Sequence, residues 1–190
     1  QPHDGDIRGF WVLSGKALLD NHQQLGELLQ DILFNARFDE VKRMQEIMAQ
    51  IKLGREQGIV SNGHSYAMGV ASQNIALISQ LDQRLSGMQS IKDFRVTESA
   101  LKDDEKCREF GKNLATLLTK IQNSPYELIV LNDADNIAEV GQAFAAVMAH
   151  TADRDFEAFK VPFASKEGET IKLGWAINAP VFYCAKTYKT

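Results

Sequence analysis

The sequence predicts an α+β fold in which amphipathic helices pack on a mixed or antiparallel sheet. Apolar residues recur every three to four positions over most of residues 21–122, which is the spacing of a helix face. β-Branched and aromatic residues gather in short segments nearer both ends, as they do in strands. The segments run strand, several helices, strand, helix and then strands, an α+β order with few strands for so many helices. We therefore expect an incomplete sheet.

The composition is that of a globular protein. The 190 residues are 44% hydrophobic and 24% charged with a net charge of −4, so no strong field favours nucleic acid or an anionic membrane as a partner. No apolar run approaches the roughly 20 residues that span a bilayer. Two distant cysteines, Cys107 and Cys184, do not make a disulfide framework, and they predict a cytoplasmic or other reducing compartment.

The first 60 residues predict one strand and two helices. Residues 8–15 are typical of a strand that ends in a turn. Asn21 is the expected N-cap of the first helix, whose apolar stripe comprises Leu25, Leu28, Leu29, Ile32 and Leu33. Asp39 opens the second helix, and Gly54 and Gly58 are expected to end it. Its apolar face comprises Val41, Met44, Ile47, Met48 and Ile51.

The middle of the chain predicts more helices. Ser61-Asn62-Gly63 precedes a helix rich in small residues, and helical signals continue to Gly87. A short helix follows from Met88. Residues 103–105 place negative charge at the start of a long helix, where the helix dipole favours it. The apolar stripe of that helix comprises Cys107, Phe110, Leu114, Leu117, Leu118 and Ile121.

The last third returns to strand-like segments. Residues 126–131 predict a short buried strand, after which Asp133 or Asp135 caps a helix that reaches Met148. Residues 160–163 and 170–173 resemble strands around a turn. Residues 175–186 predict a long strand, and Pro180 within it favours an edge position or a bulge.

No motif predicts catalysis or metal binding by this chain. His3, His22, His64 and His150 are isolated, and neither His-Glu-x-x-His nor its inverse, His-x-x-Glu-His, occurs. We therefore expect no catalytic residue and no metal ligand. Cys107 lies on an apolar helix face, where a buried inert thiol is the default interpretation.

His64 is the most interesting single residue, because it follows Gly63 at a predicted helix start. A catalytic base or a metal ligand would need a positioned partner, and no carboxylate lies nearby in sequence. We favour an imidazole that hydrogen-bonds a neighbouring loop.

Four segments, taken in order, resemble one family. They are Trp11-Val12-Leu13-Ser14-Gly15-Lys16-Ala17-Leu18 with the Leu-rich helix and Phe38-Asp39 after it, Ser61-Asn62-Gly63-His64-Ser65-Tyr66-Ala67, Leu85-Ser86-Gly87-Met88, and residues 175–186. Together they resemble presequence proteases, zinc metallopeptidases of the pitrilysin/insulinase type. Asn62 is one residue more than that family's Ser-Gly-His-x-Tyr-Ala pattern has at this point.

The resemblance implies a segment of the C-terminal half of such an enzyme. Residues 1–155 would be a helix-rich α+β part of its third domain, and residues 156–190 a connector and the first strand or strands of its last domain. The N-terminal half of the enzyme would hold zinc through an inverted His-x-x-Glu-His motif and a later Glu, and the two halves would close on a chamber. Gly63, His64, Tyr66 and Ala67 would form a family-typical helix start with a structural role.

The leading hypothesis is therefore a non-catalytic scaffold that forms part of a chamber wall in a zinc-dependent, peptide-degrading endopeptidase. This segment would hold no cofactor, and its partners would be the catalytic half and, in the parent, peptide substrates. One alternative is a stand-alone inactive relative that acts as a structural or interaction subunit. Another is an independent α/β enzyme that uses Cys107, as a thiol enzyme would, or His64. An exposed edge at residues 175–186 could also pair with a second copy.

Overall fold

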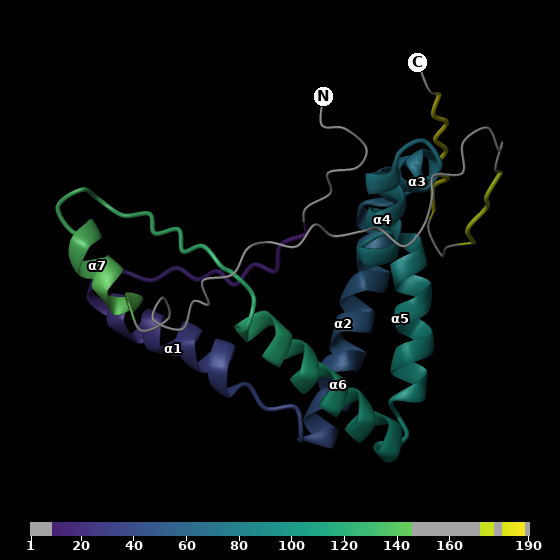
Figure 1. The fold of residues 1–190 in the computed structure, drawn as a ribbon. Coiled ribbons are helices and arrows are strands. Elements are labelled where there is room, and N and C mark those ends of the chain that lie inside the picture. Colours follow the sequence, from purple (N-terminus) through teal and green to yellow (C-terminus); the bar gives the residue numbers. More distant parts are fainter. Residues whose placement is uncertain (1–8, 146–171, 177–179, 189–190) are drawn as a thin grey trace. The chain divides into compact units, whose positions relative to one another are not determined.

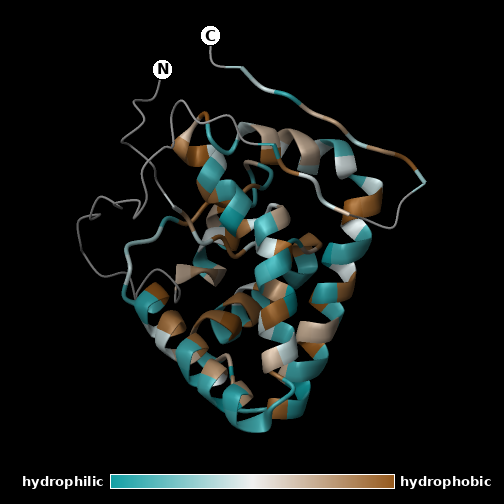
Figure 2. Cartoon of the chain, turned by 90° about the vertical axis from the view of Figure 1, so that its right-hand side faces the viewer, coloured by the Kyte–Doolittle hydropathy of each residue, from teal (hydrophilic) through white to brown (hydrophobic). Residues whose placement is uncertain are grey.

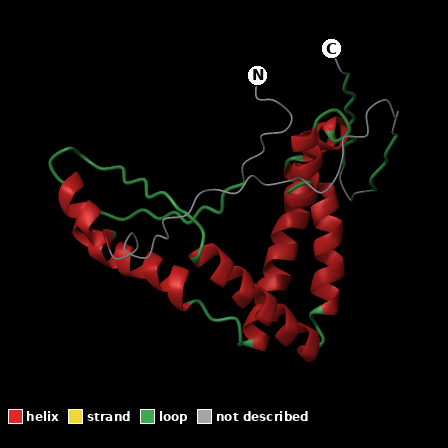
Figure 3. Cartoon of the chain, viewed as in Figure 1, coloured by secondary structure: helices red, strands yellow, loops and turns green. Residues whose placement is uncertain are grey.

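The computed structural model describes residues 9–145, 172–176 and 180–188 (Figure 1). Helices make up 64% of this part of the chain, and it contains no strand (Figure 3). The predicted α+β class with a sheet is therefore wrong for the described residues, which are all-helical. In chain order, the elements are the 3-10 helix η1 (Leu19–Asn21) and the α-helices α1 (His22–Asn35), α2 (Val41–Ser61), α3 (Gly63–Ser72), α4 (Leu77–Leu85), α5 (Met88–Ala100), α6 (Asp104–Gln122) and α7 (Ile137–Ala143).

The segments expected as strands lie in loops wherever they are described. These are residues 9–15, residues 126–131 and most of residues 175–186. A strand exists only where a neighbouring segment pairs with its backbone N–H and C=O groups. Aromatic and β-branched composition makes a segment suitable for a strand but supplies no partner. The expected strand at residues 160–163 lies outside the described residues, as does the end of the last helix at Met148.

The chain divides into two compact units. Of the described residues, the first unit contains 41–107, 172–176 and 180–188, and the second contains 9–40 and 108–145. The division passes through α6 immediately after Cys107. The domain boundary expected at residue 155 lies outside the described residues and stays a prediction.

In the first unit, α2 and α5 lie side by side (Figure 1) and run antiparallel. Lys52 Nζ lies 3.3 Å from Glu98 Oε2, and one turn further along α2 Glu56 Oε1 accepts a 2.6 Å hydrogen bond from Arg95 Nε. Lys102 Nζ lies 3.6 Å from the other carboxylate oxygen of Glu98, whose side chain is only 9% exposed. A carboxylate this buried costs free energy unless it is paired, so the two lysines are what allow it to lie between the helices.

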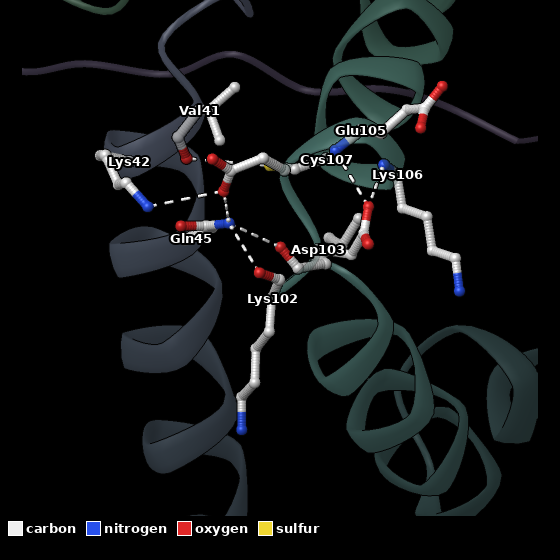
Figure 4. A network of polar contacts seen from close by, with 10 residues as sticks. Val41, Lys42, Gln45, Lys102, Asp103, Glu105, Lys106 and Cys107 are labelled. Atoms are coloured by element: carbon white, nitrogen blue, oxygen red, sulfur yellow. Dashed lines mark hydrogen bonds and ion pairs between the residues drawn. The ribbon is translucent and has the colours of Figure 1, made fainter.

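Gln45 joins α2 to the turn between α5 and α6 (Figure 4). Its side-chain amide nitrogen donates to Leu101 O at 2.9 Å, to Lys102 O at 3.4 Å and to Asp104 Oδ1 at 3.0 Å. The last carbonyls of a helix have no partner inside the helix. Gln45 therefore satisfies carbonyls just after the end of α5 and at the same time contacts the first residue of α6.

Helix α2 continues through Gly54 and Gly58 to Ser61, so the expectation that these glycines end it is wrong. Each glycine costs about 1 kcal/mol relative to alanine within a helix. Beyond both of them, Ile59 packs in a buried cluster with Met88 and Ile91 of α5, against which Tyr66 and Val70 of α3 also pack. Apolar burial at the end of α2 offsets the weak propensity of its middle.

The helix caps only partly follow the expectation. Asp103 Oδ1 accepts 3.0 Å hydrogen bonds from the backbone N–H groups of Glu105 and Lys106, which confirms the predicted acidic start of α6 (Figure 4). Asn21 stands at the N-cap position of α1, but its side chain makes no capping bond. The predicted cap of α7 by Asp133 or Asp135 is wrong, because α7 begins at Ile137 and Asn136 is its N-cap residue.

In the second unit, α1 packs against α7. A Cβ atom added to Gly26 would lie 2.6 Å from Ala143 O, so only glycine allows this approach of the two helices. Apolar and polar positions alternate along the helices (Figure 2), yet Leu28 and Ile32 on the expected stripe of α1 are 55% and 40% exposed. No helix in the described part of the chain is both long and apolar enough to cross a bilayer.

The Glu98 contact predicts a measurable loss of stability. Glu98→Ala should lower the free energy of unfolding by about 1–3 kcal/mol, because two lysines lose their carboxylate and a gap opens between α2 and α5. Urea titration followed by circular dichroism measures this. Glu46→Ala is the control, since Glu46 forms an exposed i,i+3 pair with Arg43 and should cost under about 0.5 kcal/mol. Equal losses in both variants would contradict the account.

Candidate functional site

The predicted motif around Gly63 lies where α2 passes into α3. Helix α2 ends at Ser61 and α3 begins at Gly63, so only Asn62 separates them. Asn62 N–H still donates to Gly58 O at 3.0 Å, and Asn62 Oδ1 accepts a 3.0 Å bond from the Ser65 hydroxyl. Asn62 thus forms a tight helix-to-helix junction by itself.

Tyr183 lies directly against this junction. Its hydroxyl donates to Val60 O at 2.9 Å, a carbonyl in the last turn of α2. Gly63 is buried beneath the Tyr183 ring, and a Cβ atom added to Gly63 would overlap the ring carbons. The tyrosine thus supplies a partner to a carbonyl that the helix itself leaves unpaired, and Gly63 provides the space for it.

Thr187 makes a second contact of the same kind. Its hydroxyl donates to Ala71 O at 2.7 Å, near the end of α3. Tyr183 is half-buried, whereas Phe182 and Cys184 on either side of it are exposed. Residues 180–188, the docked segment, therefore contact the ends of α2 and α3 through Tyr183 and Thr187. Sequence reasoning missed this contact, because its partners lie 116 and 123 positions apart.

The other residues of the motif have different surroundings. His64 is exposed, and no hydrogen bond or ion pair of its side chain is found within the described residues. Tyr66 is half-buried against the Ile59–Met88–Ile91 cluster, and Ala67 is half-buried in the same helix. The geometry thus gives Gly63 and Tyr66 packing roles, and within the described part of the chain it assembles no acid–base pair around His64.

Cys107 is enclosed by the packed helices. Its exposed fraction is 0%, and its Sγ contacts Val41 O at 3.7 Å. A nucleophilic cysteine needs access to substrate and a group that stabilises its thiolate. Full burial denies substrate access to the Cys107 side chain, which favours a structural thiol.

The described residues contain no group of three or more His, Cys, Asp or Glu side chains that could hold a metal ion. In the second unit, His22 and Glu139 line a cavity of about 240 Å³ together with Glu27. His22 Nε2 lies 3.7 Å from Glu139 Oε1, while Nδ1 lies 2.6 Å from Leu19 O. One ring nitrogen is thus occupied by a carbonyl, and the imidazole links α1 to α7. The residues described here do not fit a zinc site.

These features define a helical scaffold that carries a docked non-helical segment. The sequence profile of the family described as associated with peptidase M16, subfamily C, matches residues 1–95, half of the 190 residues. The chain therefore belongs to this peptidase-associated family, and it is a segment associated with M16-family peptidases.

Individual relatives also match parts of this chain. An uncharacterized protein of Borreliella burgdorferi is 26% identical over 143 residues, which cover 74% of this chain and 14% of that protein. Mitochondrial presequence proteases of Danio rerio and Yarrowia lipolytica are 28% and 26% identical over 81 and 82 residues, which cover 43% of this chain and 8% of each protease. The chain thus spans only a small part of the curated relatives that it matches. No solved structure matches it.

The Tyr183 contact predicts that a side chain at position 63 destabilises the fold. Gly63→Ala should lower the free energy of unfolding by about 1–3 kcal/mol, because the new methyl group overlaps the ring. Gly54→Ala is the matched control. A Cβ atom there meets nothing within 4 Å, so better helix propensity should stabilise the protein by about 1 kcal/mol.

A double-mutant cycle isolates the contact. In a Tyr183→Ala background, Gly63→Ala should lose most of its cost, because the ring that it overlaps is gone. An unchanged cost in that background, measured by urea unfolding, would show that Gly63 is needed for another reason.

Proposed function

We propose that this chain is a non-catalytic segment of a zinc-dependent, peptide-degrading endopeptidase of the M16 type, where it forms scaffold and chamber wall. The observation that carries the proposal is the match of residues 1–95 to a segment that accompanies peptidases of M16 subfamily C. The similarity to two mitochondrial presequence proteases supports the same assignment. In this proposal, the zinc ligands belong to the catalytic half of the peptidase, and this segment contributes shape and confinement of peptide substrates.

Exposed apolar side chains support a large partner such as the catalytic half. Besides Leu28 and Ile32 of α1, Leu117 of α6 and the side chains of Ile129 and Leu131 are exposed. Contiguous apolar patches at a protein surface commonly mark interfaces, and we propose that these side chains belong to one. We propose a cytoplasmic or other reducing compartment, because the sequence holds only two cysteines, which lie far apart.

The proposal predicts that the chain alone has no peptidase chemistry. A purified, metal-supplemented sample should contain less than stoichiometric zinc after dialysis and should leave a quenched fluorogenic peptide uncut. Elemental analysis and fluorescence measure the two quantities. The full-length peptidase that contains the segment is the positive control. Zinc-dependent cleavage by the chain alone, abolished by a chelator, would refute the proposal.

A stand-alone inactive relative, acting as a structural or interaction subunit, is the second candidate. The observation that favours it is the docked segment, whose Phe182 side chain is fully exposed. We propose that this exposed aromatic ring contacts a second copy in a symmetric dimer. The coding sequence on either side separates the candidates, since a continuous frame with His-x-x-Glu-His upstream supports the peptidase.

Light scattering coupled to size exclusion tests the self-pairing. A dimer that the Phe182→Lys substitution dissociates supports self-pairing, and a monomer excludes it.

A thiol enzyme that uses Cys107 is the least supported candidate, because this side chain is fully buried. Alkylation of the folded protein by iodoacetamide should modify Cys184, which is exposed, much faster than Cys107. Mass spectrometry of the two cysteine-containing peptides measures both rates. Fast modification of Cys107 at neutral pH would restore this candidate.

A further inference from the structure

A groove of about 410 Å³ lies in the second unit, between the loop that follows α1 and the first half of α6. It is unrelated to the Gly63 motif. Its lining residues are Arg37, Phe38, Asp39, Arg108, Gly111, Lys112 and Ala115.

The groove combines an apolar floor with a cationic rim. Phe38 is half-buried and Gly111 is buried, and both line the hollow. Ala115 extends this surface by one turn of α6. An apolar surface of this kind suits an apolar side chain of a peptide better than it suits a small inorganic ion.

The rim already holds one carboxylate. Arg37 donates to Asp39 through Nε at 3.1 Å and through Nη2 at 2.9 Å, a bidentate contact. The hydrogen bond from Arg37 lowers the pKa of Asp39, and the same bond raises the pKa of Arg37. Arg37 is therefore occupied by a carboxylate from its own loop.

Two further cations stand on the rim. Arg108 and Lys112 are four positions apart on α6, which places them one turn apart on the same face. Neither forms an ion pair within the described residues, whereas Arg37 forms two. The lining thus carries three cations against one carboxylate, in a chain whose net charge is −4.

We propose that this groove binds an acidic peptide segment, with a carboxylate side chain held by Arg108 and Lys112 and a neighbouring apolar side chain on Phe38. Charge complementarity and the apolar floor together select such a ligand. Two such cations are too few for nucleic acid, whose binding rests on neutralising many phosphates. The proposal concerns this chain by itself, so it stands or fails independently of the peptidase assignment.

The first test compares two fluorescently labelled peptides by anisotropy, using the whole chain at low salt. One peptide carries Glu-Glu-Leu-Phe and the other Gln-Gln-Leu-Phe. The acidic peptide should bind at least about 10-fold more tightly, because only its carboxylates form charge-assisted hydrogen bonds with the rim. Equal binding of the two peptides, or no binding of either, would overturn the proposal.

Variants then locate the site. Arg108→Gln combined with Lys112→Gln should weaken binding of the acidic peptide at least about 10-fold, whereas Lys120→Gln, an exposed lysine of the same helix outside the groove, should not change it. Circular dichroism checks that each variant is folded. If the double variant binds the acidic peptide as tightly as the unaltered chain does, the peptide does not bind in this groove.

A second pair of variants adds a charge without removing a side chain. Ala115→Glu places a carboxylate in the groove and should weaken binding, while Asn113→Glu adds the same charge to an exposed position outside it and should have a much smaller effect. Equal effects of the two would mean that only the net charge matters, which contradicts a defined site.

Discussion

The pairing of α2 with α5 around the buried carboxylate of Glu98 is the constraint on which the rest of the first unit depends. It sets the antiparallel register that brings Ile59 at the end of α2 to Ile91 near the start of α5. Because α2 ends there, its unpaired carbonyl at Val60 is presented beside the start of α3. That carbonyl is what Tyr183 binds, so the position of the docked segment follows from the helix pair.

The sequence predicts the helices well and the sheet wrongly, for one physical reason. A helix satisfies its backbone within its own residues, so apolar spacing and a cap such as Asp103 are enough to recognise α6. A strand is satisfied by another segment, and the composition of residues 126–131 says nothing about whether one is present. The prediction that Gly54 and Gly58 end α2 failed for a related reason. Tertiary packing beyond these two glycines outweighs their weak helix propensity.

The candidate sites, too, combine features that the sequence indicates with features that it does not indicate. Gly63 could be singled out from its motif, but the reason for a glycine there is the Tyr183 ring, which no local pattern indicates. The groove on α6 depends likewise on a loop about 70 positions earlier in the chain. The family profile covers residues 1–95, so the interpretation of α6 and of the docked segment rests on their geometry alone. We propose that both surfaces contact partners.

The most direct test of this account removes the segment from the peptidase to which we assign it and then supplies it in trans. The remaining protein should keep its full zinc content, because the metal ligands are proposed to lie elsewhere, but should turn over peptides slowly. Added segment should restore turnover without changing the zinc content. Loss of zinc on removal, or unchanged peptide turnover without the segment, would contradict the central claim that this chain is a necessary wall without chemistry of its own.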